Sequence, residues 1–154
     1  MITFEPITEE TLYIAKEILN SNRDYNILEN GKPDRSDEEV REEFLNDNST
    51  NVFIKADDTY IGVIEYMLLN PKDETTWIGL FMIHSDYHGF GYGLIAYSAF
   101  EEIIRLESTP KLRLAVLEKN EAAKHFWERV GYSFYDKSKV KENNVNCYEK
   151  ILSI

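Results

Sequence analysis

Residues 80–93 read LFMIHSDYHGFGYG, an apolar run that leads into glycines at three alternate positions. The apolar run ends a β-rich stretch, Thr75 to Ile83, whose lack of polar alternation predicts a central strand covered on both faces. After Gly93, apolar residues recur at helical spacing as far as Leu106, and Pro110 stops the helix. The three glycines therefore lie between a buried strand and the first turn of a helix.

This position suits a phosphate group. Free N–H groups at a helix N-terminus point outward, the helix dipole adds partial positive charge, and glycines lack the Cβ atoms that would keep a pyrophosphate away. Two familiar phosphate loops do not fit, because no Gly-Lys-Ser/Thr tripeptide exists and Leu94 stands where a dinucleotide fingerprint needs glycine. The alternative is a glycine-rich turn without a ligand, and the three alternate glycines favour the anion site over it.

The rest of the chain alternates strand and helix patterns. Strands are expected at 2–6, 52–56, 60–69, 112–117, 132–135 and 146–152, the second and third as a hairpin. Helices are expected after Thr8, after a capping box formed by Ser36 and Glu39, and after Asn120, with Gly131 as a C-terminal cap. Hairpins together with strand-helix-strand units predict a mixed α/β domain.

Length and composition exclude several classes of protein. The 154 residues predict one domain, and a net charge of −11 without a basic patch argues against nucleic acid and anionic membranes as partners. Residues 1–22 lack the unbroken apolar stretch of a secretory signal, so we expect a cytoplasmic protein. Cys147 is the only cysteine, which excludes an internal disulfide and a cysteine-based metal cluster, and we expect it to be a small apolar residue on a strand.

Two segments resemble the motifs of the GNAT superfamily of N-acetyltransferases. The segment 80–93 is similar to its acetyl-CoA motif. That motif is Gln/Arg-x-x-Gly-x-Gly/Ala, where x is any residue. His88 stands at the Gln/Arg position, and Gly91 and Gly93 stand at the two positions for a small residue. The segment 120–132 resembles the family's helix that begins at an Asn. The end of that helix has the pattern aromatic-x-x-x-Gly-aromatic, where x is any residue. The first third of the chain matches only in the order of its elements.

This resemblance implies a GNAT-like α/β (α+β) fold, with a mixed, mostly antiparallel sheet of about seven strands flanked by about four helices. It implies a single acetyl-CoA-dependent N-acetyltransferase domain over residues 1–154, which uses acetyl-CoA as cosubstrate and no metal. The implied reaction transfers the acetyl group to a primary amine of a small molecule or a protein, by direct attack of the amine on the thioester. A homodimer is compatible with this family.

The resemblance also assigns residues to acetyl-CoA. They are Phe81, Met82, Ile83, His88, Gly89, Phe90, Gly91, Tyr92, Gly93, Leu94, Asn120, Ala123 and Trp127. The backbone of the strand residues would pair with the pantetheine arm, the loop amides would hold the pyrophosphate, and the last three residues would border the thioester. A backbone N–H near Met82 or Ile83 would stabilise the tetrahedral oxyanion.

Glu65 and His84 are the candidate catalytic bases. An amine must lose a proton as it attacks a thioester, and a lysine-like amine has a pKa near 10.4, so a base or a water chain should accept that proton. Glu65 interrupts the apolar run of its strand, where a charge is costly unless it is paired or functional. His84 follows the cofactor strand and titrates near neutral pH. The ordinary alternatives are that Glu65 faces solvent and that His84 caps a turn.

Trp127 departs from the family pattern, because many members have there a Tyr that is thought to protonate the departing thiolate. An indole N–H donates a hydrogen bond but is no acid near neutral pH. Either Tyr87, Tyr132 or Tyr135 takes this role, or the thiolate, with a pKa near 8.5, leaves unprotonated. His88 in place of Gln or Arg is a milder change, because main-chain groups hold the pyrophosphate.

Other function classes remain open at this point. A catalytically inactive CoA-binding sensor or regulatory domain agrees with Trp127 and with the lack of an unmistakable base, whereas a structural partner without cofactor does not explain the glycines. A polyamine, an aminoglycoside or a lysine-bearing protein are all compatible acceptors. Residues 25–44 should wall the acceptor cleft. Their acidic residues Asp34, Asp37, Glu38 and Glu39 either attract a cationic acceptor or form the solvated start of a helix, and the dipole favours the second reading.

Overall fold

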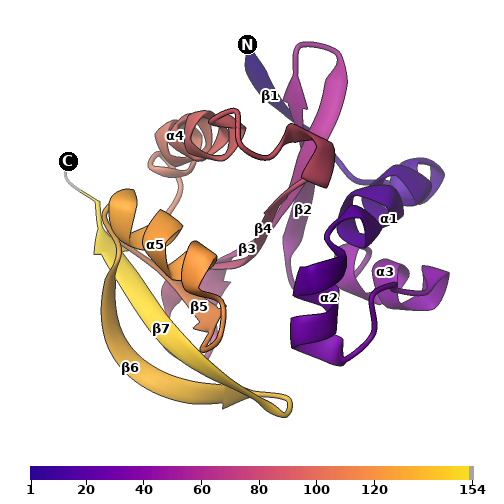
Figure 1. Ribbon diagram of the computed structural model, residues 1–154. Helices are drawn as coiled ribbons and strands as arrows, with labels where there is room; N and C mark the ends of the chain where they lie inside the picture. The colour runs from indigo at the N-terminus through magenta and orange to yellow at the C-terminus, as the bar shows by residue number, and fades with distance from the viewer. Residues whose placement is uncertain (153–154) are drawn as a thin grey trace.

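The structure is a computed structural model and describes residues 1–152. Strands and helices follow one another along the chain as drawn in Figure 1. In order they are β1 (Ile2–Pro6), the 3-10 helix η1 (Glu9–Thr11), α1 (Leu12–Ser21), α2 (Arg23–Asn30), α3 (Asp37–Phe44), β2 (Thr50–Ala56), β3 (Thr59–Asn70), β4 (Thr75–Ile83), the 3-10 helix η2 (Ser85–Tyr87), α4 (Tyr92–Ile104), β5 (Lys111–Leu117), α5 (Glu121–Arg129), β6 (Ser133–Val140) and β7 (Asn143–Ile151).

The strands form one seven-stranded sheet in the order β1-β2-β3-β4-β5-β7-β6. All neighbouring strands are antiparallel except β4 and β5, which confirms the predicted mixed, mostly antiparallel sheet. Figure 1 shows α4 and α5 on one face of the sheet and α1 to α3 on the other. Each face has its own hydrophobic core, one built around Tyr97, Phe100 and Trp127 and the other around Leu19 and Phe44.

The helix α2 was missing from the four helices expected. Its only fully buried residue is the polar Asn26, so the apolar periodicity that marks α1 is absent from its sequence. Asn22 separates α1 from α2, and its side-chain amide donates to the carbonyl oxygens of Ile18 (3.0 Å) and Ile83 (3.1 Å). The strand β6 is also longer than expected, because as an exposed edge strand with lysines it has little apolar alternation.

The sheet opens between its two parallel strands. The β4–β5 ladder consists of three pairs, the last of which joins Ile78 to Leu114, and beyond it the strands separate. Asp73 fastens the closed end, since its Oδ2 accepts hydrogen bonds from Trp77 Nε1 (2.7 Å) and Arg113 Nη1 (3.0 Å). This divergence creates the opening in which the functional residues gather. None of the helices within residues 1–152 has the length and apolar character to cross a membrane.

Candidate active site

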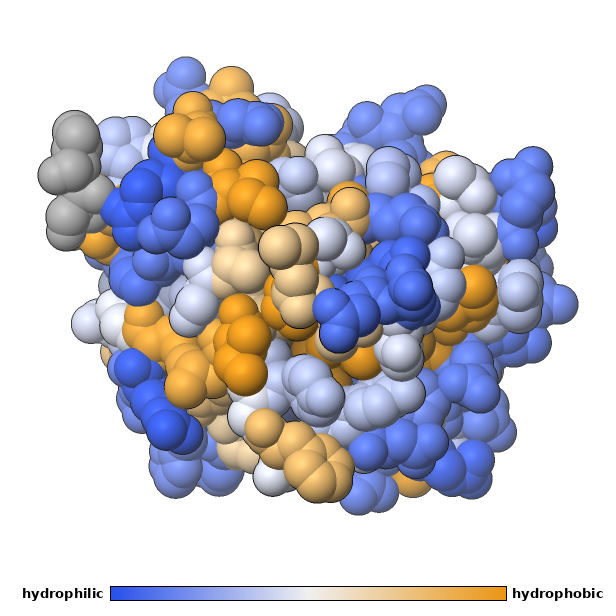
Figure 2. All heavy atoms as spheres, turned by 90° about the horizontal axis from the view of Figure 1, so that it is seen from above, coloured by the Kyte–Doolittle hydropathy of each residue, from blue (hydrophilic) through white to orange (hydrophobic). Residues whose placement is uncertain are grey.

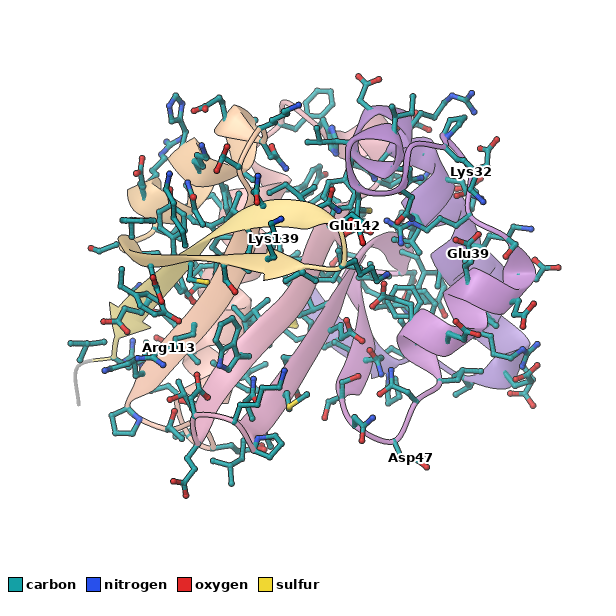
Figure 3. All side chains as sticks on the ribbon, turned by 90° about the horizontal axis from the view of Figure 1, so that it is seen from below. Lys32, Glu39, Asp47, Arg113, Lys139 and Glu142 are labelled. Atoms are coloured by element: carbon teal, nitrogen blue, oxygen red, sulfur yellow. The ribbon has the colours of Figure 1, made fainter. Side chains whose placement is uncertain are left out.

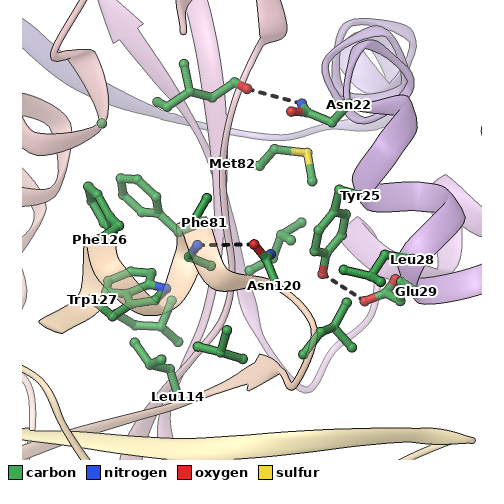
Figure 4. A pocket seen from close by; sticks show the side chains of 18 of the residues that line it. Asn22, Tyr25, Leu28, Glu29, Phe81, Met82, Leu114, Asn120, Phe126 and Trp127 are labelled. Atoms are coloured by element: carbon green, nitrogen blue, oxygen red, sulfur yellow. Dashed lines mark hydrogen bonds between the residues drawn. The ribbon is translucent and has the colours of Figure 1, made fainter. Parts of the chain in front are cut away.

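A cleft of about 1060 Å³ lies where β4 and β5 diverge. Its walls come from both faces of the sheet: α2 and the end of α3 on one side, the loop before α4 and the helix α5 on the other. Figure 4 shows Tyr25 and Glu29 of α2 facing Asn120 and Trp127 across this cleft. The β6–β7 hairpin closes a third side, and Asn143 Nδ2 reaches across to donate to the carbonyl oxygen of Glu29 in α2 (2.8 Å). Seen from below in Figure 3, the hairpin with Lys139 and Glu142 crosses the molecule toward the helices of the other half. The cleft therefore passes through the sheet and connects two chemically different ends.

The predicted cofactor residues gather in this cleft. All of them line it except Phe90, whose side chain is exposed to solvent at the outside of the loop. Viewed from above in Figure 2, hydrophobic atoms collect over the half that carries α4 and α5, whereas the rim beside α1 to α3 is mostly hydrophilic. The end of the cleft near α4 and α5 thus offers apolar walls and backbone groups.

The glycines before α4 build a cradle at a helix N-terminus. Gly89 (φ +83°) and Gly91 (φ +82°) adopt left-handed backbone conformations, and a Cβ atom at either position would meet nothing within 4 Å. Ile95 N–H donates the first bond of the helix to the Gly91 carbonyl (3.2 Å), so the three amides before it precede the helical ladder. The 13-residue α4 therefore presents amides and its positive dipole end to open space, which fits a pyrophosphate.

Gly93 has a different task from the other two glycines. A Cβ atom there would lie 3.4 Å from the ring of Phe126, so the absence of a side chain lets α4 approach α5 closely. His88 fixes the start of the loop, since its Nε2 donates to the Ile83 carbonyl (2.7 Å). The same oxygen accepts from Asn22, so both of its lone pairs are used within the protein. Any backbone pairing of β4 with a ligand must therefore use other groups than the Ile83 carbonyl.

The helix α5 brings Asn120, Ala123 and Trp127 to the same cleft. Asn120 caps the helix by accepting a hydrogen bond from the Ala123 amide at its Oδ1 (3.1 Å). Trp127 is 8% exposed and packs edge-to-face against Phe81 and Tyr97. These contacts place the indole as a wall between the aromatic core and the cleft.

Of the three tyrosines considered as proton donors, only Tyr87 lines the cleft. Burial raises the pKa of Tyr132, whose hydroxyl lies 2.8 Å from that of Tyr97 inside the core. Burial also raises the pKa of Tyr135 to about 12, and its ring stacks under the Arg113 guanidinium. The last two tyrosines are therefore poorly placed and poorly acidic.

His84 lies away from the cleft, on the side of α1. Its Nδ1 accepts from the Asp86 amide (3.0 Å), so Nε2 carries the proton and donates to the Glu17 carboxylate (2.8 Å). Both ring nitrogens are occupied, and the turn-capping alternative describes this geometry. The structure does not bring His84 together with the other predicted site residues.

Glu65 does not itself line the cleft but lies behind Gly79 of β4, away from the glycine loop. Its Oε1 is 3.0 Å from the position that a Cβ atom of Gly79 would occupy, and Gly79 itself lines the cleft. Its Oε2 accepts a hydrogen bond from Ser49 Oγ (3.1 Å). Burial, and next to it the carboxyl of Glu43, raise the pKa of Glu65 to about 8, well above the ordinary value. A carboxyl in this state exchanges its proton near physiological pH.

Sequence reasoning missed several residues at this end: Asn22, Tyr25, Glu29 and Glu43 all line the cleft. Tyr25 donates its hydroxyl proton to Glu29 Oε2 (2.8 Å), as Figure 4 shows. The expectation that residues 25–44 wall the cleft covers these positions, but no spacing singled them out. The four acidic residues named as candidates do not line it. The alternative, the start of a helix favoured by the dipole, describes three of them, because Asp37, Glu38 and Glu39 form the first turn of α3. Asp37 also pairs with Lys16 (2.6 Å), and Glu39 Oε1 accepts a hydrogen bond from the Ser36 amide (2.9 Å).

Comparisons with known proteins agree with this architecture. The profile of the Acetyltransferase (GNAT) family matches residues 15–132, so the chain belongs to this family of acetyltransferases. No match was found among curated protein sequences.

Solved structures share the fold at low sequence identity. An acetyltransferase from Thermus thermophilus is 19% identical with a TM-score of 0.82, over 99% of this chain and 97% of the other. The ribosomal-protein-S18-alanine N-acetyltransferase from Escherichia coli is 12% identical with a TM-score of 0.75, over 100% and 96%. The PaiA N-acetyltransferase from Thermoplasma acidophilum, solved in complex with coenzyme A, is 17% identical with a TM-score of 0.70, over 98% and 99%.

Proposed function

We propose that the protein transfers an acetyl group from acetyl-CoA to a primary amine. The observation that carries this proposal is the cleft, which has an anion-binding helix N-terminus on one wall and the carboxyl-bearing residues Glu29 and Glu43 on another. The half-buried Glu65, whose pKa is raised, lies behind the cleft-lining Gly79. A phosphorylated donor and an amine acceptor need these two features at the two ends of one channel. Membership of the acetyltransferase family supports the same reading.

In this proposal one end of the cleft binds acetyl-CoA and the other receives the amine. The amides of Gly89 to Leu94 bind the pyrophosphate, and the wall formed by Asn120, Ala123 and Trp127 borders the pantetheine arm. A backbone N–H of β4 near Met82 stabilises the oxyanion that forms when the amine attacks the thioester carbon. Glu65, reached past Gly79, accepts the proton that the amine loses. His84 has no part in this scheme, because its two ring nitrogens are engaged with the Glu17 carboxylate and the Asp86 amide.

Thiolate release needs no dedicated acid in this scheme. The amine nitrogen forms a bond to the acyl carbon, the C–S bond breaks, and its electron pair leaves on sulfur. A thiolate with a pKa near 8.5 is a tolerable leaving group at neutral pH. Trp127 then shapes the cleft and excludes water without donating a proton.

Calorimetric titration with acetyl-CoA, with NAD as control, tests the first half of the proposal. We expect stoichiometric binding of acetyl-CoA at micromolar concentration and none of NAD. Release of free thiol from acetyl-CoA in the presence of small amines and of a lysine-bearing peptide tests the second half. Binding without turnover of any amine would instead support a catalytically inactive CoA-binding sensor, and absence of binding would refute both readings.

A further inference from the structure

The tip of the β6–β7 hairpin reaches past the end of β5. The last pair of the β5–β7 ladder is Leu117–Val145, whereas β6 and β7 stay paired with each other as far as Val140–Asn143. Beyond β5 the hairpin therefore continues as a two-stranded ribbon. Such a ribbon is only marginally stable by itself, so the position of the tip depends on the contacts that it makes elsewhere.

A side-chain hydrogen bond ties this tip to α2 across the cleft. Asn143 Nδ2 donates to the Glu29 carbonyl oxygen (2.8 Å), although the two residues are 114 positions apart in the chain. Glu29 lies in the last turn of α2, where carbonyl groups lack a partner within the helix. Both residues line the cleft, and so do Val140, Lys141 and Val145 of the hairpin. The bond is therefore part of the cleft wall and closes the side between α2 and the hairpin.

The end of α2 is the fixed side of this tie. The Glu29 carboxylate accepts hydrogen bonds from Arg35 Nη2 and from the Tyr25 hydroxyl (2.8 Å). Arg35 is 7% exposed, and its Nε donates to Oδ1 of the fully buried Asn26 (3.0 Å). A buried polar network whose members are hydrogen-bonded holds its surroundings rigidly. When the tie opens, it is thus the hairpin tip that moves.

The tie decides which shapes of acceptor can approach the thioester. An amine within a polypeptide brings main chain on both sides of the reacting residue, and this chain needs an open groove beside the cleft. The hairpin crosses toward the helices of the other half of the molecule, as Figure 3 shows, and its bond to Glu29 closes the groove at this point. A free small amine needs only a passage as wide as itself.

We propose that the acceptor is a small-molecule amine, and that Asn143 excludes polypeptide acceptors by holding the hairpin tip on α2. The inference rests on the proposed function and decides between the two acceptor classes that it leaves open. Asn143 is a positioning residue here, because it acts through the hairpin and touches no reacting atom. Polypeptides then bind only to a minor form in which the tie is open, and their apparent affinity is reduced by the fraction of that form.

Two conjugates of coenzyme A test this selectivity without turnover. In one, an S-acetyl linker joins coenzyme A to n-propylamine, and in the other the same linker joins it to the central lysine of a short peptide. Calorimetric titration measures the affinity of the protein for each. The wild type should bind the propylamine conjugate within about threefold of acetyl-CoA, and the peptide conjugate at least about tenfold more weakly.

Two variants of Asn143 isolate the hydrogen bond. Asn143→Ala removes the side-chain amide, and Asn143→Asp keeps its shape but offers acceptors alone. In both, the affinity for the peptide conjugate should rise about three- to tenfold, as expected for the loss of one hydrogen bond between neutral groups. The affinities for acetyl-CoA and the propylamine conjugate should stay within about twofold. Asn144→Ala is the matched control and should change none of the three, because Asn144 is the exposed neighbour and does not line the cleft.

Trypsin cleavage after Lys139 and Lys141 measures the opening of the tip independently of any ligand. It should be about three- to tenfold faster in Asn143→Ala than in the wild type and in Asn144→Ala. A merely structural role of Asn143 would lower the Tm and weaken both conjugates alike.

The titrations also separate the failure of this inference from that of the proposed function. If the wild type binds the two conjugates within about threefold of each other, or if the Asn143 variants leave the ratio of their affinities unchanged, the inference alone is overturned. If acetyl-CoA itself does not bind, the proposed function is overturned and the inference with it.

Discussion

Replacement of Gly91 by glutamate separates the phosphate-binding role of the glycine loop from its role in folding. The residue adopts φ +82°, where a side chain costs about 1–2 kcal/mol of stability, and its Cβ would meet nothing within 4 Å. A negative charge at the N-terminus of α4 recovers about 0.3–1 kcal/mol through the helix dipole. The variant should therefore fold, with a free energy of unfolding lower by about 1 kcal/mol.

The effect on binding should be much larger. A glutamate carboxylate about 5 Å from a phosphate, at an effective dielectric constant of about 20–40, repels it by about 2–3 kcal/mol, which corresponds to a roughly 30- to 150-fold loss of acetyl-CoA affinity. Calorimetric titration measures the affinity, and urea unfolding measures the stability.

Two control variants isolate the cause of the loss. Gly31→Glu places the same side chain at φ +78°, again with nothing within 4 Å of the Cβ, but outside the cleft at the C-terminus of α2. It should lose at least as much stability, because the dipole opposes the charge there, and keep full affinity. Gly91→Ala introduces the backbone strain without the charge and should bind within about tenfold of wild type. If Gly91→Glu bound acetyl-CoA within about threefold of wild type, the loop would not hold the pyrophosphate.

Three further changes probe the cleft and the sheet. Trp127→Phe should reduce kcat less than tenfold at unchanged acetyl-CoA affinity, because the residue shapes the wall; a much larger fall would assign the indole N–H a chemical role. In Gly79→Val the Cβ would sit 3.0 Å from Glu65 Oε1. The variant should lower kcat at least about tenfold while acetyl-CoA affinity stays within about threefold of wild type. An unchanged kcat would show that the amine does not reach Glu65 past this residue. Asp73→Asn should lower the free energy of unfolding at pH 7 by about 1–2 kcal/mol. Burial alone would raise the pKa of Asp73, but its hydrogen bonds, including that from Arg113, outweigh burial and hold the pKa below its ordinary value. The ionised Asp73 therefore stabilises the fold above its unfolded-state pKa of about 3.9, and this stabilisation is lost as pH falls through its folded-state pKa. In urea unfolding, the free energies of unfolding of wild type and variant should converge below about pH 4.

Local patterns were sufficient to predict most of the fold. The continuous apolar run of β4 and the glycines before α4 are signals contained within a few neighbouring residues, and so is the capping box of Ser36 and Glu39, which both bonds of the structure confirm. The helix α2 escaped prediction because its buried side is built on Asn26, a polar residue that bonds the carbonyl oxygens of Leu19 and Pro33. Periodicity of apolar residues cannot reveal a helix that buries an amide.

The acceptor end of the site was less predictable for a related reason. Glu65 could be selected as a charge inside an apolar strand, whereas Glu43 looks like any acidic residue in a helix rich in them. Only the three-dimensional structure shows that the end of α3 brings Glu43 to the wall of the cleft. Conversely, His84 had the right residue type at the right place in the sequence, but the turn after β4 directs its ring toward Glu17 of α1.

The parting of β4 from β5 at Ile78 leaves a strand edge in the interior of the sheet. Main-chain groups of this edge lack a neighbouring strand on the β5 side, so we expect an extended ligand to add the missing hydrogen bonds there. Amide hydrogen exchange along Gly79 to Ile83 should therefore slow when acetyl-CoA is present, together with a rise in the melting temperature that grows with ligand concentration. In a cell, the metabolic supply of acetyl-CoA would then set how firmly the two halves of the sheet are held together, and how well this inner edge is protected from pairing with other chains.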